Sequence, residues 1–145
     1  MRHTLSLVSL LLVAAVMSGC ASTSLELNFI AIKPVNVPKS DVDGQGASRV
    51  VDVRIYQLKT NNKFNDASVE NVWVDAEGTL GDSLIEVKAG ESIFPEDPKD
   101  PRVGRVIKID PVDANTKFIG VLALFSDGEN DRKVSVPVEE AGQVI

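Results

Sequence analysis

The sequence predicts a mainly β protein, a two-sheet β-sandwich with a short helical insertion at about residues 64–81 and a long loop between its first two strands. Three observations support this prediction. About six short segments have the alternation or the apolar content of strands, and turn-forming residues separate them. One segment between them has helical spacing instead. Hydrophobic residues make up 43% of the sequence, which is enough for the core of one compact domain.

The first two strands are separated by the long loop. Leu25, Leu27 and Phe29 alternate with polar residues, a pattern that indicates a half-buried strand. From Val50 to Leu58 the alternation is stronger, with Val51, Val53 and Ile55 on one face and Asp52, Arg54 and Tyr56 on the other. Between these segments, Lys33 to Ser48 contains two prolines and two glycines. A loop of this length is often functional or disordered.

The period changes between Phe64 and Gly81. Apolar residues now fall at the spacing i, i+3, i+4 of a helix, namely Val69, Val72 and Trp73. Either Asp66 or Ser68 can serve as the N-cap, and Asp75 can cap a second short turn that ends at Gly81. We therefore expect one or two short helices, with Trp73 and Leu80 facing the core.

The middle of the chain predicts two further strands. Leu84 to Lys88 forms one, and the dipeptide Ala89-Gly90 is expected to end it. Phe94 to Gly104 contains three prolines, which predicts an exposed loop. Val106 to Ile109 forms the next strand, which is expected to end before Asp110-Pro111.

The last two strands form a predicted hairpin. Phe118 to Phe125 is apolar at almost every position, which is typical of a central strand covered on both faces. Asp127-Gly128 is a turn signal, and Lys133 to Val138 alternates as the returning strand. Six short strands with one helical insertion indicate a β-sandwich.

The N-terminus has the layout of a secretory signal peptide at residues 1–19. Arg2 and His3 are basic, and the apolar run from Leu5 to Met17 is shorter than the roughly 20 residues that a membrane-spanning helix needs. Met17-Ser18-Gly19-Cys20 resembles the lipobox of bacterial lipoproteins. We expect cleavage before Cys20, attachment of a diacylglycerol to its thiol and of an N-acyl chain to its amino group, and no other cofactor.

This attachment would tether the chain to a membrane. Two or more acyl chains make such anchoring durable, and Cys20 is the single cysteine of an exported chain, which acylation would explain. The alternative is an ordinary signal peptide beside a chance cysteine. Ala21 favours the outer membrane over retention at the inner membrane, so we expect a lipid-anchored protein on its periplasmic face. Residues 20–24 would form a short tether and residues 25–145 the β-sandwich domain.

The composition excludes several classes of function. His3, the only histidine, leaves with the signal peptide, and acylation blocks Cys20, so neither a Ser-His-Asp or Cys-His site nor a typical zinc site can form. Asp41-Val42-Asp43-Gly44 lacks the spacing of a calcium loop, and an acidic turn in solvent is the preferred interpretation. We expect no catalytic, cofactor or metal site, although an enzyme acting through paired carboxylates remains an alternative. The net charge of −6 argues against nucleic acid and against peripheral binding to anionic lipid.

Several segments together resemble the TssJ family, outer-membrane lipoproteins of the type VI secretion membrane complex. Val51 to Lys59 is similar to that family's V-x-V-R-[hydrophobic]-Y-Q-L strand. Phe64, Trp73 and Leu80 to Leu84 follow the order of its helical insertion, and Ala89-Gly90-Glu91 stands near its P-G-E. Phe118 to Asp127 resembles Y-[IL]-G-V-x-A-x-[FY]-R-D. The chain departs from the family pattern at Ala89, Phe118 and Ser126, and it lacks the tryptophan often found after that last motif.

The resemblance implies a transthyretin-like sandwich without enzymatic activity. It also implies a structural role in the type VI secretion system and a partner, the periplasmic C-terminal region of the inner-membrane protein TssM. In that family the loop between the first two strands contributes to this contact. Carried onto this chain, the contact residues would be Val35, Asn36, Val37, Pro38 and Lys39. The alternatives are a solvated connector at this loop and, for the whole protein, a ligand-binding or adhesion lipoprotein unrelated to secretion.

Overall fold

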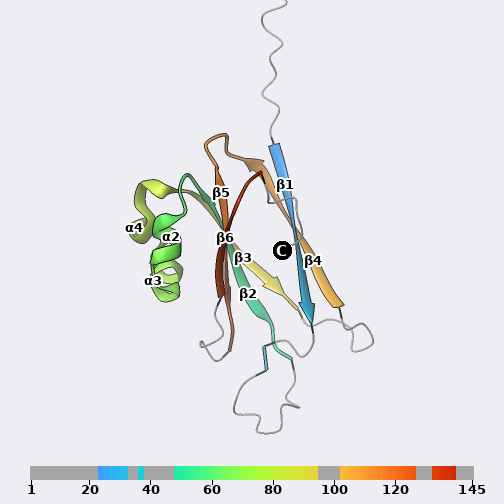
Figure 1. Ribbon diagram of the computed structural model, residues 1–145. Helices are drawn as coiled ribbons and strands as arrows, with labels where there is room; N and C mark the ends of the chain where they lie inside the picture. The colour runs from blue at the N-terminus through green and yellow to red at the C-terminus, as the bar shows by residue number, and fades with distance from the viewer. Residues whose placement is uncertain (1–22, 33–35, 38–47, 95–101, 127–131, 140–145) are drawn as a thin grey trace, which may run out of the picture.

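The computed structural model describes residues 23–32, 36–37, 48–94, 102–126 and 132–139 (Figure 1). Within these ranges the elements follow one another as β1 (Thr23–Ile32), β2 (Val51–Leu58), α2 (Asn62–Asp66), α3 (Val69–Val74), α4 (Ala76–Leu80), the 3-10 turn η2 (Gly81–Ser83), β3 (Leu84–Ile93), β4 (Arg102–Val112), β5 (Phe118–Leu124) and β6 (Arg132–Pro137). In the described part of the chain, no helix has the length and apolar content to cross a membrane.

The strands form two antiparallel sheets that face each other. β1 pairs with β4, and the second sheet has the order β3-β2-β5-β6. The three helices lie on the outer side of the four-stranded sheet, away from β1 and β4 (Figure 1). The predicted two-sheet sandwich with a helical insertion is therefore confirmed, with three short helices in place of the one or two expected.

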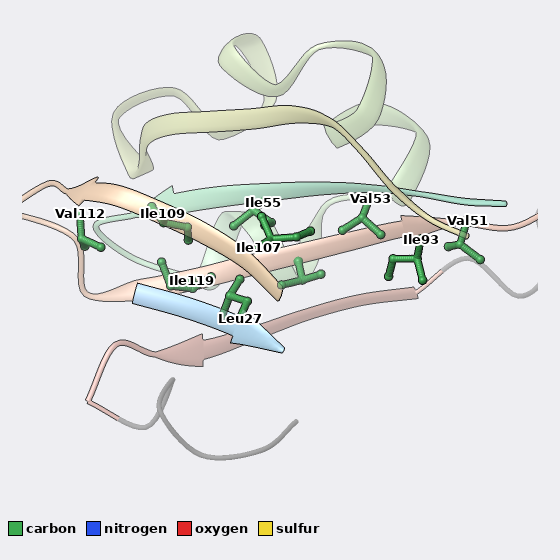
Figure 2. Close-up of a cluster of buried hydrophobic side chains, with 10 residues drawn as sticks. Leu27, Val51, Val53, Ile55, Ile93, Ile107, Ile109, Val112 and Ile119 are labelled. Carbon is green, nitrogen blue, oxygen red and sulfur yellow. The ribbon is translucent and has the colours of Figure 1, made fainter. Parts of the chain in front are cut away.

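The core between the sheets consists almost entirely of branched aliphatic side chains (Figure 2). The alternation of β2 places Val51, Val53 and Ile55 in this core, each at most 4% exposed. Because β-branched side chains pack well on a pleated surface, such residues suit a sandwich interior. The other buried members are Leu27, Ile93, Ile107, Ile109, Val112, Ile119 and Val121.

A second apolar cluster lies between the four-stranded sheet and the helices. Its buried members are Tyr56, Leu58, Phe64, Val72, Leu80 and Leu122. The predicted central strand β5 is thus covered on both faces, as its continuous apolar run indicates. The alternation of β2 predicts that Tyr56 faces outward, but Tyr56 is fully buried because the helices cover this half of the sheet.

Two predicted strand ends differ from the structure. β3 does not end at Ala89-Gly90 but continues to Ile93, because Gly90 adopts a positive φ of 79° and the pairing with β2 shifts at this point as in a bulge. β4 begins at Arg102, inside the predicted loop, and continues past Ile109 to Val112. Pro111 cannot donate to a neighbouring strand, and it lies opposite a shift in the β1–β4 register, where proline is tolerated in a sheet.

Candidate partner-docking site

The topology gathers three chain connections at one end of the sandwich, which we call the loop end. There β1 ends and β4 begins, with Ile32 opposite Arg102. β2 begins and β3 ends, with Val51 opposite Ile93. β5 ends and β6 begins at the same end, since Asp52 pairs with Leu124. The connections after β1, β3 and β5 therefore leave from neighbouring positions (Figure 1).

The opposite end, the tether end, holds the start of β1. Thr23 is paired with Val112 there, and Leu58 with Phe118. Cys20 lies outside the described residues, but only Ala21 and Ser22 stand between it and Thr23 in the sequence. Ten residues of extended strand span roughly 30 Å, so β1 separates the two ends by about that length.

Asn36 ties the first loop to the loop end. Its side-chain Nδ2 donates to the carbonyl oxygen of Val50 at 2.5 Å, and its Oδ1 accepts from the backbone N–H of Ser126 at 2.6 Å. Its φ of 53° lies in the left-handed region that asparagine tolerates better than most residues. The start of β2 and the end of β5 are thereby joined to the first loop through one side chain.

The structure describes only two of the five predicted contact residues. Asn36 and Val37 are both half-buried at the loop end, whereas Val35, Pro38 and Lys39 lie outside the described residues. Because both polar atoms of the Asn36 amide are bonded within the protein, this residue holds the loop in place. Nothing in the sequence pattern distinguishes that role from direct contact with a partner.

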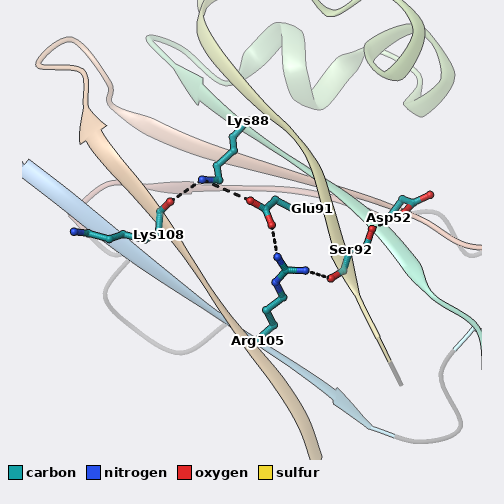
Figure 3. Close-up of polar contacts among 6 residues, drawn as sticks. All are labelled: Asp52, Lys88, Glu91, Ser92, Arg105 and Lys108. Carbon is teal, nitrogen blue, oxygen red and sulfur yellow. Dashed lines mark hydrogen bonds and ion pairs between the residues drawn. The ribbon is translucent and has the colours of Figure 1, made fainter. Parts of the chain in front are cut away.

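Side chains close the side of the sandwich where β3 and β4 meet without strand pairing (Figure 3). Arg105 forms an ion pair with Glu91 at 2.7 Å and donates to the carbonyl oxygen of Ser92. Lys88 donates to the carbonyl oxygen of Lys108 at 3.0 Å. These cations occupy backbone acceptors that would otherwise be open to another strand, and they hold the two sheets together from the middle of the strands toward the loop end.

Sequence reasoning missed two exposed apolar residues at the loop end. Val50 is 39% exposed and Phe94 is 50% exposed. The sequence offers one signal for Phe94, an aromatic residue placed directly after a strand and before Pro95. Val50 reads as an ordinary first residue of a strand, and only the structure shows that it is uncovered.

A cavity of about 310 Å³ lies beside the β3–β4 contact and is the place where a small ligand would bind on the alternative hypothesis. Gln57 is one of its polar lining residues, and its side-chain amide already forms hydrogen bonds within the protein. It donates to Glu86 at 2.8 Å and accepts from the Asp113 N–H and the Thr116 hydroxyl, each at 2.8 Å. These bonds join β2, β3 and the turn before β5, which is a structural use of the residue. Across the described ranges no group of three or more His, Cys, Asp or Glu side chains is arranged to hold a metal ion.

Comparison with known proteins matches the chain to one family over almost its whole length. A family profile described as "Type VI secretion lipoprotein, VasD, EvfM, TssJ" matches residues 23–144. No curated protein sequence compared with the chain matches it.

Several solved structures are similar to the chain. Serratia marcescens Lip, a membrane-bound component of the type VI secretion system, is 21% identical with a TM-score of 0.66, over 79% of this chain and 73% of that one. The lipoprotein TssJ1 from Pseudomonas aeruginosa is 22% identical with a TM-score of 0.62, over 80% and 81%. A chain of a type VI membrane complex is 26% identical with a TM-score of 0.61, over 81% and 82%. A chain in a structure of the TssM C-terminal domain from EAEC is also 26% identical, with a TM-score of 0.58 over 81% of each chain.

Proposed function

Because the chain belongs to the TssJ family of type VI secretion lipoproteins, we propose that its loop end docks the periplasmic C-terminal domain of a TssM-like inner-membrane protein. The family is structural and non-enzymatic, and its members are outer-membrane lipoproteins. The role is therefore mechanical, because one end of a rigid domain is held at the membrane while the other end holds a partner.

The observation that supports this proposal is the separation of the two ends. The strands β1, β3 and β5 end at the loop end, whereas β1 begins with Thr23 at the tether end. Acyl chains on Cys20 would bring the tether end close to the lipid headgroups, since three extended residues reach only about 10 Å. The loop end then points into the periplasm, where an inner-membrane protein can reach it. The match to a chain in a TssM C-terminal domain structure is consistent with this partner.

The first loop is the proposed contact, through Val35, Asn36, Val37, Pro38 and Lys39. The test replaces Val35 and residues 37–46 with Gly and Ser residues and leaves Asn36 in place, so that its bonds to Val50 and Ser126 survive. We expect loss of binding to the purified TssM periplasmic domain with an unchanged melting temperature. Lys59→Ala, an exposed change at the tether end, is the matched control and should bind normally. Full affinity of the loop variant would refute the contact at this loop.

The tether proposal has its own experiment. Residues 1–19 would be removed as the signal peptide, Cys20 would carry the acyl chains, and residues 20–24 would lead into the domain at 25–145. Cys20→Ser should release the protein from the membrane fraction, and mass spectrometry of the native product should find the acyl mass on the N-terminal residue. An unmodified thiol at position 20 in a membrane-bound product would overturn this assignment.

A further inference from the structure

We propose that the docking surface extends beyond the first loop onto the exposed apolar pair Val50 and Phe94, and that Phe94 inserts into an apolar recess of the TssM periplasmic domain as the main contact. This inference rests on the proposed function, because it assigns residues to the same binding event.

Strand alternation turns both side chains away from the core. Val51 and Ile93 are opposite each other in the β2–β3 register and are buried, at 4% and 8% exposed. Successive side chains of a strand point to opposite faces of the sheet. Val50 and Phe94 are the next residues outward, just beyond the paired strands. The same alternation continued by one position places both on the opposite face, and their exposed fractions of 39% and 50% agree with this placement.

The helices do not reach this pair. α2, α3 and α4 cover the half of the sheet that carries Tyr56, Leu58 and Leu122, whereas Val50 and Phe94 lie at the other end of β2 and β3. Large apolar side chains left uncovered at one end of a domain are typical of an interaction site when they lie together. Aromatic residues are also enriched among those that dominate binding energy.

The backbone beneath the pair is held firmly. The carbonyl oxygen of Ser92, two residues before Phe94, accepts from Arg105, and the Ser92 hydroxyl donates to Asp52 at 3.0 Å. On the other strand the carbonyl oxygen of Val50 accepts from Asn36. A side chain on a fixed backbone loses little conformational freedom when it binds, which favours affinity.

The pair is continuous with the first loop through that same bond. Asn36 belongs to the loop and Val50 to the pair, and 2.5 Å separates their bonded atoms. A partner domain that contacts the loop beside Asn36 is therefore next to Val50 and, across the register, to Phe94. This continuity identifies the occupant as the partner already proposed for the loop.

The test measures the affinity of the full acylated protein in detergent for the purified TssM periplasmic domain. Phe94→Ser should weaken binding about 30-fold or more, the size of effect that defines a dominant interface residue. Val50→Ser should weaken binding several-fold, and Phe94→Leu should keep most of the affinity. The matched control is Val106→Ser, which removes a 57% exposed apolar side chain from the outer face of the β1–β4 sheet and should bind normally.

The outcomes separate this inference from the proposed function. If the loop replacement abolishes binding while Phe94→Ser and Val50→Ser bind normally, the extension is wrong and the docking function stands. If neither the loop replacement nor these substitutions affects binding, the docking site itself is wrong. Melting temperatures are measured for every variant. If Phe94→Ser fails to fold, the binding of Phe94→Leu and Val50→Ser is compared with that of Val106→Ser. Equal affinity of these three variants would overturn the proposal.

Discussion

The two apolar clusters that flank the four-stranded sheet differ in the side chains that compose them. Among the residues whose side chains the structure describes, the core between the sheets contains ten buried aliphatic side chains, all contributed by strands. The cluster under the helices depends on rings, since Tyr56 and Phe64 pack with their centroids 5.3 Å apart at a tilt of 53°. A core of many similar side chains can redistribute a lost contact, whereas a cluster built around one ring has no replacement for it. We therefore expect the helix-side cluster to be the more sensitive of the two.

Cations from the sheet also distinguish the helix-side cluster. The guanidinium of Arg54 lies 3.8 Å from the centre of the Trp73 ring, and it donates to the Trp73 carbonyl oxygen at 2.5 Å. Lys133 donates to the carbonyl oxygens of Asn65 and Ala67 at the end of α2, and burial lowers the pKa of its ammonium group. Unpaired carbonyl groups at helix C-termini attract cations. The short helices are therefore held to the sheet by charge as well as by apolar packing.

The largest expected effect is that of Phe64→Ala. Phe64 is fully buried, and removing its ring should lower the free energy of unfolding by about 3–5 kcal/mol. Ile107→Ala in the core between the sheets should fall in the lower part of the ~2–5 kcal/mol range for such changes, because branched neighbours can partly fill the space. Urea unfolding of the two variants measures both. An equal or greater loss for Ile107→Ala would contradict the comparison.

Gly120→Ala should be the next most damaging change. A Cβ atom on Gly120 would stand 2.9 Å from Cζ of Phe64 and 3.1 Å from Cδ1 of Leu58, which is closer than carbon atoms normally approach. Such overpacking costs roughly 1–3 kcal/mol. The cost should be smaller in a Phe64→Leu background, so a double-mutant cycle should give a coupling energy between the two positions. If the stability losses of the two substitutions were strictly additive, the Phe64 ring would not pack against Gly120.

Arg54→Gln tests the attachment of the helices by charge. Loss of the stacking on Trp73 and of the bond to its carbonyl oxygen should cost about 1–2 kcal/mol. Trp73 is the single tryptophan of the chain, so a change in its fluorescence reports the same contact directly. Arg54→Lys keeps the charge without the flat guanidinium, and its stability should lie between that of the unsubstituted protein and that of Arg54→Gln. A Trp73 spectrum unchanged in Arg54→Gln would indicate that the stacking is absent in solution.

The smallest predicted effects concern the helix caps. Ser68 accepts from the N–H of Asn71 at 3.1 Å, and Asp75 accepts from the N–H of Gly78 at 2.8 Å. Alanine at either position should cost about 1 kcal/mol. Asp66, the other cap candidate in the sequence, lies at the end of α2, so Asp66→Ala should stay within about 0.5 kcal/mol of the unsubstituted protein. Thermal unfolding measures the three variants. If Asp66→Ala lowered the melting temperature most, the assignment of the caps to Ser68 and Asp75 would be wrong.

These particulars show which parts of the fold could be predicted from the sequence. The strands whose alternation faces a single core were found, because Val51, Val53 and Ile55 repeat at the period of a strand. The ends of β3 and β4 were missed because Gly90 forms a bulge and Pro111 lies at a register shift, and both residue types more often mark a strand end. For the candidate site, the first loop was predicted to contact a partner because the chain resembles the TssJ family. The bonds of Asn36 were not predicted, since Ser126 lies 90 residues further along the chain.

The sequence by itself determined the strand periods, the helical insertion with a cap at Asp75 and another at either Asp66 or Ser68, and the family resemblance. These properties depend on residues close together in the chain, where local geometry and hydrogen bonding act. Only the tertiary structure decided that Tyr56 is buried, that Phe64 packs against Gly120, and that Asn36 bonds to Val50 and Ser126. Each of these contacts joins segments far apart in the chain, and no local pattern encodes which face another segment will cover.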